Sequence, residues 1–213
     1  MYLSRVEVDR ENRRKSRDLS HVGAYHHWVE QSFPDELEKN IRTRKLWRLD
    51  YLNGKEFLLI VSETPPNLGL LEKYGVIKSS QTKEYDTFLH SLQEGTQARF
   101  RVTLNPVVSV VNKEAKRGQV KPHVTVDQQL KFLRDRSEKN GFSLKESEYT
   151  IVERAYVEYR KSGQRPLRLS KVTYEGMLRI SDVNLFNRTL TEGIGKKKAY
   201  GFGMMTIIPI TKT

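Results

Sequence analysis

Apolar side chains recur along residues 2–8 with the alternation that is typical of a short β-strand. A basic run follows over residues 10–17, and we expect it to form a solvated loop. Asp18 or Ser20 can cap the helix that comes next, which should reach about residue 32. The pattern therefore predicts that the chain begins with a strand, a basic loop and a helix.

Two further strands are predicted at residues 45–52 and 56–62. Asn53-Gly54 between them is typical of a two-residue hairpin turn, because both residues adopt positive φ readily. Residues 67–95 show no period that decides their structure, and residues 97–110 have the pattern of another strand. The first half therefore has the order β-α-β-β, an unassigned stretch, and β.

A second group of elements begins with a helix whose first turn carries a capping box, formed by Thr125 and Gln128. Asn140-Gly141 is expected to end this helix. Strands are predicted at residues 149–160 and 167–180, and the hairpin tip between them is rich in positive charge. The second half therefore starts with the order α-β-β.

The last two predicted elements are a helix capped by Ser181, which ends before Gly193, and a strand over residues 204–210. The second half then has the order α-β-β-α-β. This is the order of a ferredoxin-like unit whose first strand is weak or is contributed by earlier residues. We therefore predict an α+β protein with two similar halves, an N-terminal domain over residues 1–112 and a C-terminal domain over residues 113–213.

The charge of the chain narrows the class of partner. Its 213 residues carry a formal net charge of +12, and the pI is about 9.8, which favours nucleic acid as a ligand. The absence of cysteine excludes disulfides and thiolate metal sites, and it fits a cytoplasmic protein. No apolar run approaches the roughly 18 residues of a membrane span, so no membrane partner is expected. No acidic pair has metal-binding spacing, so neither a metal nor a cofactor is expected.

The segment between the last helix and the last strand is rich in glycine, lysine and aromatic residues. Its sequence is Gly193-Ile194-Gly195-Lys196-Lys197-Lys198-Ala199-Tyr200-Gly201-Phe202-Gly203. Backbone N–H groups in glycine turns and nearby lysines both bind phosphate oxygens. The spacing matches neither GxxxxGK[ST] nor a GxGxxG between a strand and a helix. We interpret the segment as a phosphate-binding loop, and the alternative is a surface turn without a ligand.

Three of the five histidines, His21, His26 and His27, cluster in the first predicted helix. A histidine pair beside Tyr25, in a very basic protein, suits general acid–base chemistry on RNA, because imidazole titrates near neutral pH. Ribose supplies its own nucleophile, the 2′-OH, so such a reaction needs no metal. Adjacent histidines on a helix point about 100° apart, which disfavours a shared metal. A purely structural role for these histidines is the alternative.

Taken together, the chain resembles the CasE-type endoribonucleases of the CRISPR Cascade complex, members of the repeat-associated RNA-binding superfamily. The resemblance covers nearly the full length and rests on the order and spacing of several anchors. These are Met1-Tyr2-Leu3-Ser4-Arg5-Val6, Ser16-Arg17-Asp18-Leu19, His26, Phe33-Pro34, Phe100-Arg101, Asn105-Pro106, Tyr174-Glu175-Gly176 and the glycine-rich segment. The resemblance implies two tandem ferredoxin-like domains. It also implies metal-independent cleavage of precursor CRISPR RNA on the 3′ side of a stem-loop, with other Cascade subunits as partners. We expect a monomer when the protein is isolated.

The resemblance also assigns catalytic residues. His26 falls on the family's catalytic histidine, since Phe33 follows it by seven residues, and His27 is the rival if the helix is turned differently. The family often has tyrosine where this chain has Gly23, and Tyr25 is a candidate to replace it. The lysine of the family's glycine-rich loop falls on Lys198.

The remaining assignments concern RNA binding. The family's basic hairpin falls on Arg160, Arg165 and Arg168, and the loop contributes both backbone and lysine contacts. The full set of expected RNA-binding residues is Arg17, Arg101, Arg160, Arg165, Arg168, Gly193, Gly195, Lys196, Lys197, Gly201 and Gly203. The alternatives to an enzyme are a non-catalytic RNA-binding scaffold subunit of the same superfamily and a ribosomal-type RNA-binding protein.

Overall fold

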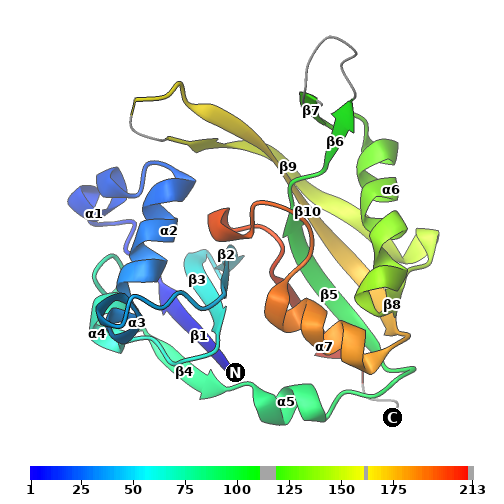
Figure 1. Cartoon of the computed structure of the whole chain (residues 1–213), viewed down its shortest axis with the longest axis horizontal. Coiled ribbons are helices and arrows are strands. Elements are labelled where there is room, and N and C mark those ends of the chain that lie inside the picture. The colour runs from blue at the N-terminus through cyan, green and yellow to red at the C-terminus, as the bar shows by residue number, and fades with distance from the viewer. Residues whose placement is uncertain (111–118, 161–162, 211–213) are drawn as a thin grey trace.

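The computed structural model describes residues 1–110, 119–160 and 163–210, and it contains two antiparallel sheets and a separate two-stranded ribbon (Figure 1). The first sheet has the order β2-β3-β1-β4. Its strands are β1 (Tyr2–Glu7), β2 (Lys45–Leu52), β3 (Lys55–Ser62) and β4 (Gln81–Glu84). The helices of this half are α1 (Arg13–Asp18), α2 (Val22–Gln31), α3 (Pro34–Glu38), α4 (Leu68–Leu71) and α5 (Asp86–His90).

The second sheet has the order β11-β5-β10, and both β8 and β9 pair with β10. Its strands are β5 (Gln97–Leu104), β8 (Phe142–Ser143), β9 (Tyr149–Tyr159), β10 (Leu167–Ile180) and β11 (Met205–Pro209). The ribbon consists of β6 (Val107–Val110) and β7 (Gln119–Pro122), and the helices are α6 (Val126–Ser137) and α7 (Val183–Glu192). Short 3₁₀ turns are η1 (Glu138–Asn140), η2 (Glu146–Glu148) and η3 (Lys198–Tyr200).

Both sheets have ferredoxin-like topology, which confirms the expected α+β fold. In the first unit α2 connects β1 to β2, and β1 lies between β3 and β4. In the second unit α6 and α7 connect β5 to β9 and β10 to β11, and β5 lies between β10 and β11. Each unit thus repeats the β-α-β-β-α-β order of a split βαβ fold. The first strand of the second unit is β5, which comes from residues before position 112. This agrees with the alternative that earlier residues contribute that strand.

Sheet membership does not follow the expected domain division at residue 112. Strand β5 lies before that position, yet it pairs with β10 and β11 of the second sheet. Helix α5 precedes β5, and its Leu89 packs into a core cluster formed mainly by the second unit, with Leu46 and Val61 of the first sheet at its edge. Pairing in the sheet decides which unit a strand belongs to, and local sequence does not carry that information. We infer that the domain boundary lies near residues 85–96.

Several local predictions are confirmed, and others are corrected. Asn53 and Gly54 both have positive φ in the β2–β3 turn, and Thr125 forms the expected capping box. The prediction of a loop over residues 10–17 is wrong, because residues Arg13–Asp18 form α1 with Asn12 as its cap.

The cap of α2 is neither Asp18 nor Ser20 but His21, whose imidazole accepts a hydrogen bond from the N–H of Gly23. Likewise Asp182 rather than Ser181 caps α7. The predicted strand 97–110 is interrupted at Asn105-Pro106, because proline has no N–H for the ladder.

A buried arginine joins the two sheets. Arg48 on β2 is 1% exposed, and its guanidinium donates to the carbonyl oxygens of Arg101 (2.7 Å) and Met204 (2.9 Å) in the second sheet. The same group is paired with Asp50, at 2.6 Å. A buried charge needs such partners, because an unpaired one costs several kcal/mol. Arg48 therefore fixes β2 relative to β5 and to Met204, which directly follows the glycine-rich segment and precedes β11.

No helix in the described ranges is long and apolar enough to cross a membrane.

Candidate functional site

The glycine-rich segment folds back onto β2 and α2 of the first unit, and this contact creates the candidate site (Figure 1). The indole Nε1 of Trp47 on β2 donates to the carbonyl oxygen of Ala199, at 3.0 Å. One residue further on, the ring of Tyr200 meets the imidazole of His26 edge-on, with centroids 5.7 Å apart. The fold therefore brings His26 into contact with the glycine-rich segment, although the two are far apart in sequence.

His26 is half-buried in the middle of α2, with a side chain 33% exposed. Its Nδ1 lies 3.9 Å from a carboxylate oxygen of Glu30, one helical turn later. Burial lowers the pKa of His26, and Arg42 and Lys45 lower it further, while Glu30 opposes the shift. The imidazole is therefore predominantly neutral at pH 7 and can accept a proton.

His27 differs from His26 in its position on the helix. Consecutive helical side chains point about 100° apart, and the side chain of His27 is exposed, while His26 contacts Tyr200 of the loop. The structure therefore places His26, and not its rival, against the glycine-rich segment.

Tyr25 lies in the core and not beside His26. Its ring stacks on Trp47, with centroids 5.8 Å apart, and is only 5% exposed. Its hydroxyl accepts a hydrogen bond from Arg10. Burial raises the pKa of Tyr25 to about 12. The expectation that Tyr25 substitutes for a tyrosine at position 23 is corrected. Tyr25 and His26 are adjacent on α2, so their side chains point about 100° apart.

Two tyrosines that were not predicted as site residues lie close to His26. Tyr200 contacts it directly, and Tyr159, the last residue of β9, lies beside Tyr200 with ring centroids 4.4 Å apart. Tyr200 could have been selected from the sequence, because it lies inside the glycine-rich segment. Nothing in the local sequence indicated Tyr159, because its contact depends on how β9 crosses α2.

Lys198 begins the same 3₁₀ turn that ends at Tyr200. Its side chain is partly buried. Burial lowers its pKa, and Arg44 lowers it further, while Glu192 at the end of α7 opposes the shift. Lys196 and Lys197 are exposed, and Lys197 lies over the ring of Tyr200 at 5.8 Å. The loop thus presents two exposed ammonium groups and a third that is partly sheltered from water.

The glycines of the loop have the positive φ values that the sequence suggested: Gly193 (75°), Gly195 (79°), Gly201 (83°) and Gly203 (88°). At Gly201 a Cβ atom would lie 2.7 Å from the ring of Trp47, and at Gly203 it would lie 2.4 Å from the carbonyl oxygen of Ile194. Close approach to the protein itself therefore explains these two glycines. Contact with RNA is not needed to account for them, so their assignment to RNA binding stays a prediction.

Further cations near His26 lie on the segment between α3 and β2 and at the first residue of β2. Arg42 and Arg44 are exposed, while Lys45 is 6% exposed and paired with Glu36 (2.7 Å) and Glu30 (3.4 Å). Arg42 and Arg44 were not predicted as site residues, although both stand in an evident basic run of the sequence. With the lysines of the loop they make the surroundings of the imidazole strongly positive, as a phosphate site requires.

The three hairpin arginines, Arg160, Arg165 and Arg168, are exposed, but their neighbours differ. Arg168 lies opposite Glu158 in the β9–β10 ladder and over the ring of Tyr156, at 4.9 Å. Arg160 forms an ion pair with Glu158. Directly opposed residues share one face, and neighbours along a strand alternate, so this face is opposite to that of Tyr159. Arg165 lies at the described part of the tip, residues 163–166.

The two remaining arginines fall in different surroundings. Arg17 is exposed on α1, and its assignment to RNA binding stays a prediction. Arg101 is held by two carboxylates, Asp50 at 3.3 Å and Glu175. Binding of a phosphate by Arg101 would have to compete with both, so its assignment is weakened.

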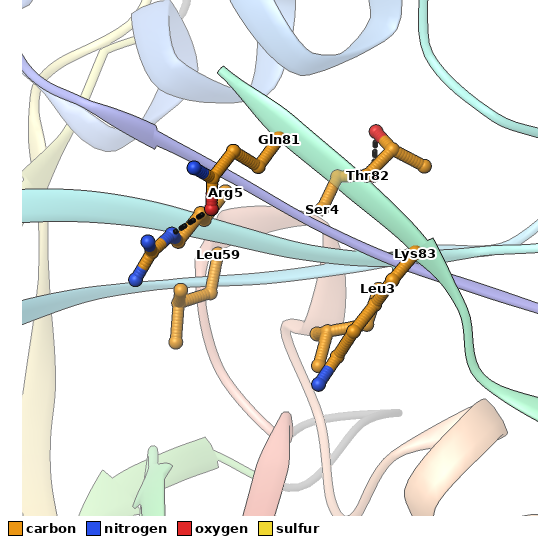
Figure 2. A pocket seen from close by; sticks show the side chains of 7 residues that line it. All are labelled: Leu3, Ser4, Arg5, Leu59, Gln81, Thr82 and Lys83. Atoms are coloured by element: carbon orange, nitrogen blue, oxygen red, sulfur yellow. Dashed lines mark hydrogen bonds between the residues drawn. The ribbon is translucent and has the colours of Figure 1, made fainter. Parts of the chain in front are cut away.

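The hollow shown in Figure 2 is separate from this site. It measures about 670 Å³ and is lined by Leu3, Ser4, Arg5, Leu59, Gln81, Thr82 and Lys83. Leu3, Arg5 and Leu59 alternate with the residues of β1 and β3 that pack under α2, so they face the other side of the sheet. The catalytic candidates therefore lie on the helical face, on an open surface and not in this hollow.

Within residues 1–110, 119–160 and 163–210, no three His, Cys, Asp or Glu side chains are grouped so that they could hold a metal ion.

Comparisons with known proteins agree with this geometry. A family model described as CRISPR associated protein matches residues 1–209. The CRISPR-associated endoribonuclease Cse3 of Thermus thermophilus is 28% identical over 220 residues, which are 98% of this chain and 100% of that protein. A structure of Thermus thermophilus Cse3 bound to an RNA representing a pre-cleavage complex is 26% identical, with a TM-score of 0.80 over 98% of each chain.

The fold also recurs in a CRISPR RNA-guided surveillance complex in a pre-nicking state. One chain of that complex has a TM-score of 0.74 and 20% identity, over 99% of this chain and 100% of that chain. The resemblance seen in the sequence is thereby confirmed. Because the family model covers nearly the whole length, this chain belongs to the family of CRISPR-associated proteins.

Proposed function

We propose that this protein is an endoribonuclease that cleaves the stem-loop repeats of precursor CRISPR RNA and so yields mature guide RNAs. The observation that carries the proposal is the contact between His26 and the glycine-rich segment at Tyr200. It places a titratable imidazole next to a loop of lysines, in a chain that matches an RNA-bound endoribonuclease almost end to end. Charge and fold alone would support RNA binding only, whereas this contact supports cleavage.

The proposed reaction is a transesterification within the RNA. A base removes the proton of the 2′-OH, the oxygen attacks the adjacent phosphorus in line, and the 5′-oxygen leaves with a proton. The products are a 2′,3′-cyclic phosphate, or a 3′-phosphate after its hydrolysis, and a 5′-hydroxyl. The lowered pKa of His26 keeps the imidazole neutral at pH 7, which supports the role of base over that of acid.

Lys198 is proposed to stabilise the negative charge that develops on the phosphorane. Fixed cations act most strongly where water is partly excluded, and the Lys198 side chain is partly buried. Lys196 and Lys197, which are exposed, would attract RNA before the reaction. Because the pKa of Lys198 is lowered from a value far above neutrality, its ammonium group is expected to stay protonated at pH 7.

The RNA stem is proposed to lie against the basic β9–β10 hairpin and α1, through contacts to the RNA backbone. A-form RNA hides the base edges of its major groove, so such contacts recognise shape. The shared fold with a surveillance-complex chain supports assembly with other Cascade subunits. We further propose that the isolated protein is a monomer and acts in the cytoplasm, without a cofactor.

The test uses purified protein and end-labelled repeat RNA in the presence of EDTA. Cleavage at one phosphodiester, with 2′,3′-cyclic phosphate and 5′-hydroxyl ends, is the expected result. Cleavage that stops in EDTA and returns with magnesium would refute the acid–base mechanism. Tight binding without cleavage under any condition would favour a non-catalytic scaffold instead.

A further inference from the structure

Three aromatic rings form a continuous row beside the proposed catalytic centre. The imidazole of His26 meets Tyr200 edge-on at 5.7 Å and 74°, and Tyr200 lies 4.4 Å from Tyr159. The rings come from three separate segments: α2, the turn η3 and the end of β9. The row therefore connects the tip end of the β9–β10 hairpin, where Tyr159 pairs with Leu167, to His26 through the glycine-rich segment.

A glycine on α2 makes room for this row. A Cβ atom at Gly23 would lie 3.5 Å from Cδ2 of Tyr159 and 2.9 Å from the imidazole of His21. Gly23 precedes His26 by three residues, so both lie on the same face of the helix. The ring of Tyr159 thus covers the helical turn directly before His26, in space that a larger side chain at position 23 would need.

The phenols themselves are unsuited to proton transfer at neutral pH. A hydrogen bond with Tyr159, together with burial, raises the pKa of Tyr200 to about 12. The contact of Tyr200 with His26 is made by its ring, in an edge-on arrangement. The contribution of the pair to His26 is therefore one of packing and orientation.

The imidazole has neighbours on two sides. Its Nδ1 lies on the side of Glu30, at 3.9 Å, which is beyond hydrogen-bond distance, and the edge-on contact with Tyr200 restricts rotation of the ring. The χ2 torsion of histidine is otherwise broad, so a ring without such contacts samples many orientations. With Nδ1 directed to Glu30, the opposite nitrogen, Nε2, is the one left to act on RNA.

We propose that Tyr159 and Tyr200 are positioning residues for the cleavage reaction, which fix the imidazole of His26 in its productive orientation. This inference rests on the proposed function. It makes the tip end of the β9–β10 hairpin part of the catalytic centre, in addition to any role of the hairpin in binding RNA. Misplacement of a reacting group by about 1 Å can cost on the order of 100-fold in rate.

The first test is single-turnover cleavage of repeat RNA at saturating enzyme. Tyr200→Ala and Tyr159→Ala should each lower the rate roughly 10- to 100-fold, with RNA affinity within about threefold of wild type. Tyr200→Phe and Tyr159→Phe retain the rings and should stay within about fivefold of the wild-type rate. The double alanine variant should lose little more than either single variant, because both act on one contact.

The second readout is the titration of His26 itself, followed by NMR of the imidazole and by the pH profile of the rate. Tyr200→Ala opens the imidazole to water and removes part of the burial that lowers its pKa. The titration and the corresponding limb of the rate profile should therefore both move to higher pH. Tyr156→Ala is the matched control, since it removes a tyrosine from the same strand on the opposite face and should shift neither.

If an alanine variant does not fold, as judged by circular dichroism, Tyr200→Leu fills the space without an aromatic ring and carries the same expectation for the rate. The inference is overturned if the alanine or leucine variants cleave within about threefold of wild type, or if the His26 titration does not move in Tyr200→Ala. It is also overturned if the phenylalanine variants fail to restore the rate. A wild-type protein that never cleaves would refute the proposed function, whereas the NMR titration would still test the contact with Tyr200.

Discussion

The indole of Trp47 donates a hydrogen bond to the carbonyl oxygen of Ala199, at 3.0 Å, and this contact fastens the glycine-rich segment to the first sheet. The two residues are 152 positions apart. The same indole packs against Tyr25 of α2 and against Gly201. One side chain of β2 therefore contacts both the helix that carries His26 and the loop that carries Lys198.

Trp47→Phe should loosen the loop while it preserves most of the packing. The loss of one hydrogen bond from a buried donor is expected to cost about 1 kcal/mol in the free energy of unfolding. Because the loop carries Tyr200 and Lys198, the single-turnover rate should fall further than this modest destabilisation would suggest. Denaturant unfolding and single-turnover cleavage measure the two effects. A fully stable variant that cleaves at the wild-type rate would contradict the role assigned to this bond.

His26→Ala should abolish most cleavage and leave RNA affinity nearly unchanged. General acid–base catalysis is worth about 10²- to 10⁴-fold in rate, and His26 is the histidine in contact with the loop. His27→Ala is the matched control, since its side chain is exposed, and it should have a much smaller effect. The reverse order of the two effects would show that the adjacent histidine is the catalytic one.

The pH dependence of cleavage follows from the same residue. Because burial lowers the pKa of His26, protonation of the free enzyme should occur at lower pH than for an ordinary histidine. If His26 is the base, the rate falls as pH drops through this lowered pKa, and it stays on a plateau above it. A profile that rises as pH falls through the same range would assign His26 as the acid.

Lys198→Ala should lower the rate at saturating enzyme and weaken binding only modestly. A group that neutralises charge developing in the transition state affects the saturated rate, whereas a group that only attracts RNA affects the binding constant. Lys196 and Lys197, being exposed, should share the attraction, so Lys196→Ala should appear mainly in affinity. Single-turnover rates and dissociation constants separate these effects. A Lys198→Ala protein with the wild-type saturated rate would leave the loop without a catalytic part.

Neutralising the hairpin arginines Arg160, Arg165 and Arg168 should weaken binding of the stem-loop and flatten its dependence on salt. Each lost phosphate contact reduces the log–log slope by somewhat less than one unit. Arg165 at the tip is expected to contribute more than Arg160, which is paired with Glu158. The measurement is the dissociation constant over a range of salt concentrations. If the salt slope is unchanged in the variant that lacks Arg160, Arg165 and Arg168, the β9–β10 hairpin is not part of the RNA interface.

Glu36→Gln should destabilise the first unit at neutral pH by about 2 kcal/mol, a typical value for hydrogen bonds to a charged group. Burial acts to raise the pKa of Glu36, but hydrogen bonds from Lys45, Thr43 and Thr64 outweigh it and lower the pKa to about 2. The carboxylate is thus favoured in the folded protein. Its contribution is complete above the ordinary pKa of 4.5 and is lost as pH falls towards 2.

Urea unfolding of the wild type and of Glu36→Gln at pH 7 and at low pH measures this difference. The two free energies of unfolding should converge as pH falls through this window. A constant gap between the two proteins would show that the ion pair with Lys45 does not account for the effect. Glu38→Gln serves as the control, because Glu38 belongs to the same helix and is exposed.

The elements with strong local signals were predictable. The turn at Asn53-Gly54, the capping box at Thr125 and the end of the helix at Gly141 depend on the conformational preferences of a few adjacent residues. The residues 67–95 were not assigned, because their short helices and the four-residue strand β4 have too few positions for a period to emerge. Strand β4 is stabilised by pairing with β1, which only the tertiary structure supplies.

The sequence by itself determined the class of the protein: the basic charge, the order of the elements, the histidine pair on a helix and the glycine and lysine loop. Tertiary structure decided which of these residues meet. It brought His26 to Tyr200 and Tyr159, turned Tyr25 into the core, and placed β5 in the second sheet. The physical reason is that helical and strand periods fix the face on which a side chain lies. The partner on that face comes from segments distant in sequence, through sheet pairing and core packing.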